Sequence, residues 1–148
     1  MKTRFEPRDA EFESRIRKSF SEQRVMSLLA AELKAVEPGV VEIELATRDD
    51  LTQQDGFMHA GIVTTVLDSA CGYAAYTLMP ANSSVLSVEF KVNLLAPAKG
   101  DRIAVRAEVK RPGRTLTVCT ADAFSDGNIC ATMLATMICL DRTKPNKN

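Results

Sequence analysis

The segment from Met58 to Met79 limits what this chain can fold into more than any other segment. It is nearly uncharged, it is rich in Ala, Gly, Ser and Thr, and Pro80 ends it. Apolar residues occur on almost every side of the helix it predicts, and such a helix must be surrounded by other structure. Exposing its surface to water would cost about 25 cal/mol per Å². We therefore expect one long helix at the centre of the fold.

The length of this segment also allows a membrane-spanning interpretation, because a bilayer requires about 20 apolar residues. One central carboxylate, Asp68, argues against it. An aspartate at that depth costs about 2.5 to 3.5 kcal/mol on insertion scales, and small residues stand where a typical span has leucine and isoleucine. We expect no membrane contact.

The rest of the chain supplies strands that can surround the helix. Residues 40–47 alternate apolar and acidic side chains, which is typical of a strand with one wet face. Four more strands are expected after the helix, separated by the turn signals PAKGD, RPGR and SDGN: residues 85–98, 101–113, 114–127 and 128–140. This order predicts an α+β fold in which an antiparallel sheet of about five strands wraps around the central helix.

The chain is short enough to form a single domain, residues 1–148. Within it, residues 9–35 are expected to be helical, in two segments broken near Ser19 to Ser21. We therefore divide the domain into an N-terminal helical extension (1–34), a core (35–141) and a flexible tail (142–148).

Charge and cysteine usage argue against several classes of function. Nineteen basic residues balance nineteen acidic ones, so nucleic acid is not an expected partner. The four cysteines have no CxxC spacing, and one histidine cannot form a multi-histidine zinc site. The first residues lack the apolar region of a secretory signal. We expect a reduced, cytoplasmic protein without a metal site.

Two residues of the central helix suggest chemistry: His59 and, nine residues later, Asp68. A structural aspartate held by hydroxyl or backbone groups is one interpretation. A general base or nucleophile is the other, because a carboxylate in a dry setting has a displaced proton affinity. His59 is either a cap or a packed imidazole, or it marks an anion cradle made by the free N–H groups of Ala60 and Gly61 at the helix N-terminus.

Helix geometry limits how these groups can meet. Nine helical residues separate His59 from Asp68 by about 13 Å of rise and about half a turn of rotation. One chain therefore cannot bring both to one reaction centre. If Asp68 and the helix N-terminus act together, they come from different subunits of a two-fold symmetric dimer.

The pattern Q-x-x-G-x-x-H-A-G from Gln53 to Gly61, followed by Asp68, resembles the N-x-x-G-x-x-H-G-G…D signature of acyl-CoA thioesterases of the phenylacetate-degradation (PaaI-like) type, which have the hotdog fold. Two later segments, LSVEFKVNLLAPAKGD and VKRPGRTL, resemble that family's next strand and its following hairpin. The resemblance extends over residues 35–141.

The resemblance implies hydrolysis of a fatty or aromatic acyl-CoA to the free acid and CoA, without a further cofactor. Asp68 would activate water or attack the carbonyl, and the N–H of Ala60 from the other subunit would hold the oxyanion. Gln53 would hold water or the thioester, Ser87 would orient Asp68, and His59 would shape the helix entrance. Two residues depart from the family pattern, because Ala60 stands for a glycine and Gln53 for an asparagine.

The resemblance also suggests how the substrate is held. The acyl group would enter a pocket lined by helix residues with small side chains, and basic residues near turns would pair with the CoA phosphates. The expected substrate-binding residues are Gly61, Cys71, Gly72, Tyr76, Lys99, Arg111 and Arg114. Simple solvation is the alternative for the three basic residues. The expected assembly is a homodimer that pairs further into a homotetramer.

Two other functions remain open. An enoyl-CoA hydratase or dehydratase would use an acid/base pair such as Asp55 and His59, although the H-x-D and D-x4-H spacings of such enzymes are absent. A non-catalytic acyl-CoA sensor would bind the same ligand without hydrolysing it. The N-terminal segment has no clear helix-turn-helix pattern, which disfavours a DNA-binding regulator.

Overall fold

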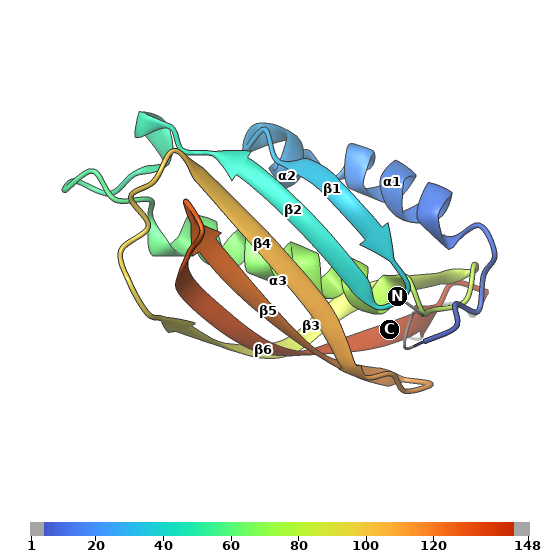
Figure 1. Ribbon diagram of the computed structural model, residues 1–148. Coiled ribbons are helices and arrows are strands. Elements are labelled where there is room, and N and C mark those ends of the chain that lie inside the picture. Colours follow the sequence, from blue (N-terminus) through green and yellow to red (C-terminus); the bar gives the residue numbers. More distant parts are fainter. Residues whose placement is uncertain (1–4, 144–148) are drawn as a thin grey trace, which may run out of the picture.

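The computed structural model describes residues 5–143 of the 148-residue chain, so that most of the expected flexible tail, residues 144–148, lies outside the described residues. Within this range the chain forms one curved antiparallel sheet and three α-helices (Figure 1). The elements are, in chain order, α1 (Phe12–Glu22), α2 (Arg24–Leu28), β1 (Glu32–Glu37), β2 (Val40–Ala46), the 3-10 helix η1 (Asp49–Leu51), α3 (Ala60–Tyr76), β3 (Ser83–Leu94), β4 (Arg102–Arg111), β5 (Leu116–Ser125) and β6 (Asn128–Asp141).

The sheet wraps around α3, as the sequence predicts. Its strands follow the order β1-β2-β4-β5-β6-β3, and every neighbouring pair is antiparallel. The long central helix lies against the concave side of the sheet (Figure 1). Val66, Leu67 and Ala70 of α3 have no exposed surface, and they pack in one core with inward-facing strand residues such as Ile43 and Met133. The predicted hotdog fold is confirmed.

The start of the sheet differs from the expectation. Residues 32–35, which the spacing of apolar residues assigned to a helix, belong to strand β1, so the described sheet has six strands. The helix before them stops because Ala30 adopts a left-handed conformation (φ 52°) and the N–H of Ala31 bonds back to the carbonyl of Met26 at 2.9 Å. This is a typical helix ending, although glycine usually occupies the left-handed position.

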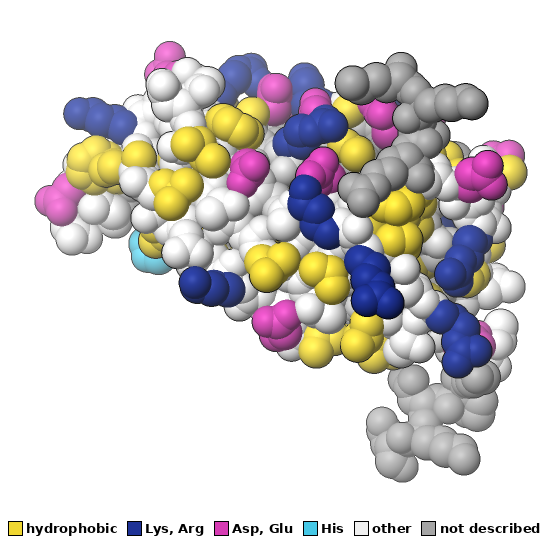
Figure 2. Space-filling model, turned by 60° about the horizontal axis from the view of Figure 1, so that its bottom comes forward, with side chains coloured by type: hydrophobic (Ala, Val, Ile, Leu, Met, Phe, Trp, Pro, Cys, Tyr) yellow, Lys and Arg dark blue, Asp and Glu magenta, His cyan; other side chains and the backbone are white. Residues whose placement is uncertain are grey.

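Strand β3 lies at one edge of the sheet. It pairs with β6 on one side, and its other side has no strand partner among residues 5–143. Leu86, Val88 and Leu94 are more than half exposed there. Figure 2 brings the underside of the view in Figure 1 forward and shows hydrophobic side chains gathered between charged ones. A long apolar edge strand favours pairing with another chain.

A membrane span was not expected, and none of the described helices combines the length and apolar character that crossing a bilayer requires.

Candidate active site

Asp68 lies on a partly exposed side of α3, facing strand β3. Contrary to the expectation of a dry setting, its side chain is only half-buried in the single chain. The hydroxyl of Ser87 donates a hydrogen bond to Asp68 Oδ1 at 2.6 Å, within the range of charge-assisted O–H···O bonds. The other carboxylate oxygen, Oδ2, accepts no hydrogen bond from residues 5–143. Ser87 therefore orients the carboxylate and leaves one oxygen available.

A groove of about 350 Å³ opens beside this carboxylate, and we call it the Asp68 groove. Its floor is α3, one wall is the first half of β3, and the other wall is the end of α1. Its lining residues are Ser19, Glu22, Gln23, Asp68, Ser69, Gly72, Tyr73, Tyr76, Ser84, Val85, Leu86, Ser87, Met137 and Arg142.

The N-terminus of α3 carries one unused amide. His59 is the N-cap, and its Nδ1 accepts a hydrogen bond from the N–H of Gly61 at 2.9 Å. The N–H groups of Ile62 and Val63 bond to the carbonyl of His59. The N–H of Ala60 has no acceptor within residues 5–143, and Ala60 is exposed. The first turn of α3 therefore offers the Ala60 amide to an incoming oxygen, with the positive end of the helix dipole behind it.

The sequence H-A-G at this turn also has a steric explanation. Ala60 is helical with an ordinary negative φ, so this position does not require the glycine of the family pattern. At Gly61 a Cβ atom would lie 3.0 Å from His59 Nδ1, which would disturb the cap. The second glycine is therefore needed for close approach of the imidazole, and His59 acts as the cap that was one of its two expected roles.

A second cavity, of about 390 Å³, lies next to Ala60, and we call it the Ala60 pocket. It is mainly apolar, and the end of β3 and the loop after it form much of its wall. Its lining residues are Gln53, Phe57, Met58, Ala60, Val63, Leu94, Leu95, Ala96, Pro97, Ala98 and Cys130. Two of the expected site residues, Gln53 and Ala60, therefore share one cavity.

The single chain does not bring Asp68 and Ala60 together. They line different cavities. Eight helical residues separate them by about 12 Å along α3. The expected groups thus fall into two sets, Asp68 with Ser87 in the groove and Ala60 with Gln53 in the pocket.

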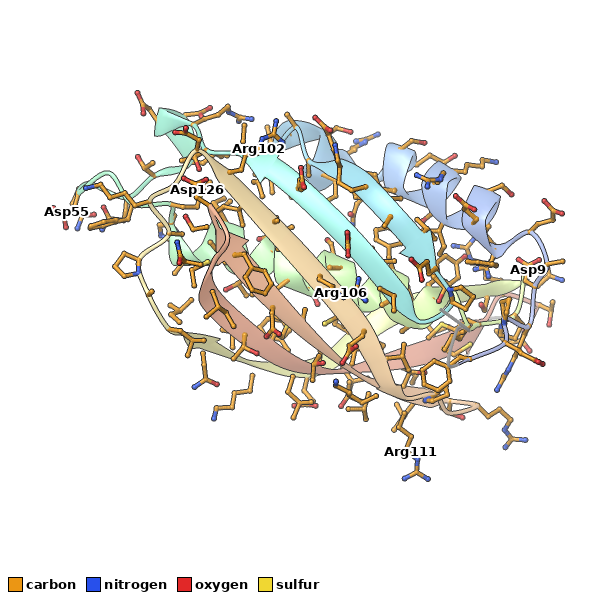
Figure 3. All side chains as sticks on the ribbon, viewed as in Figure 1. Asp9, Asp55, Arg102, Arg106, Arg111 and Asp126 are labelled. Carbon is orange, nitrogen blue, oxygen red and sulfur yellow. The ribbon has the colours of Figure 1, made fainter. Side chains whose placement is uncertain are left out.

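Gln53 is held by its own loop. Its Oε1 accepts a hydrogen bond from the N–H of Asp55, and Gly56 takes a left-handed conformation (φ 83°) next in the turn. Asp55 lies at the end of a loop that projects from the body of the molecule (Figure 3). The carboxylate of Asp55 is directed to this loop, with Gln53 Nε2 3.5 Å from Oδ2.

Of the expected acyl-binding residues inside α3, two line the Asp68 groove and one lies in the core. Gly72 and Tyr76 line the Asp68 groove, and the hydroxyl of Tyr76 donates to the carbonyl of Ser83 at 3.0 Å. Cys71 does not line it, because a step of one residue turns a helical side chain by about 100°, here into the core. Its side chain is fully buried, and burial raises the pKa of its thiol.

The three basic residues expected to bind phosphates lie at two ends of the molecule. Lys99 precedes β4 and places its ammonium 5.8 Å from the centre of the Phe57 ring. Arg111 ends β4 and points away from the sheet (Figure 3). A ten-residue strand separates them by about 30 Å. Arg114 lies at the Arg111 end and lines a third cavity together with Arg8.

Residues 5–143 contain no group of three or more His, Cys, Asp or Glu side chains arranged to hold a metal ion. The sequence reasoning missed the contribution of the N-terminal helical segment: Ser19 and Glu22 of α1 and the following residue, Gln23, line the Asp68 groove. Only packing between distant segments reveals it, for example the 3.4 Å hydrogen bond from Ser69 Oγ to Gln23 Oε1.

Comparisons with known proteins show which chains this one is similar to. A crystal structure of a thioesterase family protein from Silicibacter pomeroyi is 54% identical, with a TM-score of 0.85, and the match covers 88% of this chain and 98% of that one. A Saccharolobus solfataricus protein, whose name gives it provisionally as an esterase, is 27% identical over 84% of this chain and 83% of its own length. Human acyl-coenzyme A thioesterase 13 is 29% identical over 61% of this chain and 64% of its own length.

The family model described as the thioesterase superfamily matches residues 55–132, just over half of the chain. The match begins in the loop that carries Gln53 and extends through β3, β4 and β5 into β6. It therefore includes Ala60, Asp68 and Ser87. On the fold, the two cavities and this match, the chain belongs to the thioesterase superfamily.

Proposed function

We propose that this protein hydrolyses acyl-CoA thioesters at two equivalent sites of a homodimer. The observation that carries the proposal is the division of the site along β3. Residues 84–87 of this strand line the Asp68 groove, whereas Leu94 and the following residues line the Ala60 pocket. Asp68 and Ser87 thus lie near the start of this edge strand, and Ala60 and Gln53 lie near its end.

Self-pairing of β3 would unite the two halves. In a two-fold dimer made through this edge, the strands run antiparallel, so the start of β3 in one subunit lies near the end of β3 in its partner. The Asp68 groove of one subunit then meets the Ala60 pocket of the other. This interface would bury Leu86, Val88 and Leu94, which are apolar and exposed in the single chain.

The proposed reaction uses water, a carboxylate and a backbone amide. Asp68 takes a proton from water, or attacks the thioester carbon itself, and Ser87 holds it in position. The carbonyl oxygen becomes an oxyanion that the N–H of Ala60 from the partner subunit stabilises. When Asp68 activates water, collapse of this intermediate breaks the C–S bond and releases the free acid and CoA, which takes up the proton from Asp68. When Asp68 itself attacks, the collapse releases CoA and leaves an acyl-aspartyl anhydride, which water then hydrolyses to the free acid. Gln53 contributes an amide beside the reacting carbonyl.

The same pairing suggests how CoA is held and how the dimers associate. It brings the Lys99 end of one subunit near the Arg111 and Arg114 end of the other, which supports a shared phosphate site.

Leu134 is exposed on the outer face of the sheet, because its neighbours Met133 and Ala135 face inward. We propose that two such dimers pair through this outer face into a tetramer. Free buried cysteines fit a cytoplasmic location.

Substitution of the carboxylate tests the activity. We expect Asp68→Asn to lower kcat for thiol release from acyl-CoA by at least about 100-fold, because it removes the base but keeps the shape. The matched control is Asp49→Asn, an exposed aspartate of η1 outside both cavities. Full turnover by Asp68→Asn would refute the proposal. Tight acyl-CoA binding without hydrolysis by the wild type would identify a sensor instead.

Subunit mixing tests the composite site. Asp68→Asn and Ala60→Pro chains are each expected to be inactive as homodimers. After both are unfolded and refolded together, half of the dimers are mixed, and each mixed dimer has one intact site, so about one quarter of wild-type activity returns. Recovery of no activity, with mixed dimers shown by mass spectrometry, would contradict a site shared between subunits.

A further inference from the structure

The N-terminal helix α1 lies along α3 in an antiparallel direction. Three contacts, spaced by one helical turn, show this: Gln23 with Ser69 at 3.4 Å, Ser19 with the hydroxyl of Tyr73 at 3.5 Å, and Arg15 with the carbonyl of Tyr76 at 3.3 Å. The end of α1 is therefore level with the start of the groove floor, next to Asp68. Its beginning is level with the far end of the groove.

Helix α1 is firmly attached in this position. Ile16 is fully buried, and the ring of Phe20 packs 5.7 Å from that of Tyr73. The guanidinium of Arg15 donates to the carbonyls of Tyr76 and Met79 at the end of α3 and lies 4.3 Å from the centre of the Tyr76 ring. These contacts make α1 a fixed wall of the Asp68 groove.

The wall ends at Glu22 and Gln23, where the carboxylate of Glu22 and the amide nitrogen of Gln23 are available to a ligand. Within residues 5–143, the carboxylate of Glu22 has no hydrogen bond or ion pair, and the amide nitrogen of Gln23 has no acceptor. Glu22 is also the last residue of α1, where the helix dipole disfavours a negative charge and no basic residue occurs in the last turn. A carboxylate at this place weakens the helix. Glu22 is exposed and lines the groove, where it offers a strong hydrogen-bond acceptor.

We propose that Glu22 and Gln23 select acyl groups that carry a hydroxyl close to the thioester. This inference rests on the proposed function, and it names the substrate class of the same site. A hydroxyl can donate to the carboxylate of Glu22 and accept from the amide of Gln23 at once. Because Gln23 contacts Ser69, the neighbour of Asp68, the selected hydroxyl lies near the reacting carbonyl rather than at the end of the chain.

An unsubstituted alkyl chain is disfavoured by the same wall, since it would displace water from Glu22 and Gln23 without replacing their hydrogen bonds. Arg142 lines the opposite side of the groove and carries the one positive charge among its lining residues. Two carboxylates, Asp68 and Glu22, outweigh it, so an acyl group with its own carboxylate is disfavoured as well.

Three six-carbon substrates test the proposal with the full-length protein: hexanoyl-CoA, 3-hydroxyhexanoyl-CoA and adipoyl-CoA. We expect kcat/KM for the 3-hydroxy compound to exceed that for hexanoyl-CoA by about tenfold, the size of one hydrogen bond to a charged group. Glu22→Ala and Gln23→Ala should each reduce this ratio severalfold while hexanoyl-CoA turnover persists. Glu22→Ala puts a good helix former at the last position of α1. Gln23 has an extended backbone between α1 and α2 and its side chain makes no cap hydrogen bond, so the fold should remain intact in both variants.

Glu13→Ala is the matched control, because Glu13 lies on the same helix, pairs with Arg17 and does not line the groove. It should leave the ratio at the wild-type value. A wild-type ratio near one, a ratio unchanged by both groove substitutions, or a preference for adipoyl-CoA would each overturn the selection by Glu22 and Gln23 while the hydrolase function stands. Absence of thiol release from all three substrates and from a wider acyl-CoA panel would overturn both proposals.

Discussion

The hydroxyl of Ser87 and the carboxylate of Asp68, nineteen residues apart in the chain, are joined by a hydrogen bond of 2.6 Å between β3 and α3. Without this hydroxyl the carboxylate can rotate, and a water molecule must replace the lost hydrogen bond. We expect Ser87→Ala to lower kcat/KM about tenfold, since a hydrogen bond to a charged group is worth about 1.5 to 3 kcal/mol. Steady-state kinetics measure this.

The control for Ser87 is Ser84→Ala, which changes another serine of the groove wall that does not contact Asp68. It should retain activity within about twofold of the wild type. If Ser84→Ala and Ser87→Ala have equal effects, the hydrogen bond does not position the carboxylate.

The amide of Ala60 can be removed with little change of fold. Proline is well tolerated at the first position of a helix, and His59 already has the extended conformation (φ −60°, ψ 133°) that a residue before proline prefers. We expect Ala60→Pro to lower kcat by about 100-fold to 1,000-fold, the usual effect of losing an oxyanion donor. Ala60→Gly keeps the N–H and should keep most of the activity. Circular dichroism checks that both variants fold.

Acid should loosen α1 through Asp9. The hydrogen bond from Arg15, supported by the backbone N–H of Glu11, lowers the pKa of Asp9 below its usual value. A lowered pKa in the folded state means that the ionised pair stabilises the fold at neutral pH and that this stabilisation is lost as the pH falls through the lowered pKa. We expect Asp9→Asn to unfold at a lower urea concentration than the wild type at pH 7, and the two to converge as the pH falls below the lowered pKa of Asp9. A pH-independent difference would exclude this ion pair as the cause.

The cysteines should differ sharply in reactivity. Burial raises the pKa of Cys119 to about 12 and raises those of Cys71 and Cys130. Cys139 is the partly exposed one and lines the cavity that also contains Arg8 and Arg114. We expect the native protein at pH 8 to titrate one thiol with an aromatic disulfide reagent and the unfolded protein to titrate all four. Cys139→Ser should abolish the reaction of the folded protein with this reagent. The variant then gives no background signal in thiol-release assays.

The sequence predicts α3 and the later strands well, because their apolar residues repeat strongly and clear turns separate them. Residues 32–35 were assigned wrongly because Leu33 continues the helical spacing of Leu28 and Leu29, while the left-handed Ala30 that ends the helix has no marker in the sequence. The alternation of residues 32–37 was too short to compete with that spacing.

Within the site, the residues that follow a motif could be predicted, and those that depend on packing could not. The pairing of Asp68 with Ser87 was expected and is present. The involvement of Glu22 and Gln23 depends on α1 packing against α3, across more than forty residues of chain. The orientation of Cys71 depends on which side of α3 faces the sheet, because neighbouring helical side chains point about 100° apart.

Ala30 also has a practical consequence. An alanine held at φ 52° carries backbone strain that a glycine would not, of about 1 kcal/mol. Ala30 lines neither cavity. Ala30→Gly is therefore a stabilising background in which weakened active-site variants can be purified and compared without confusing lost chemistry with lost protein.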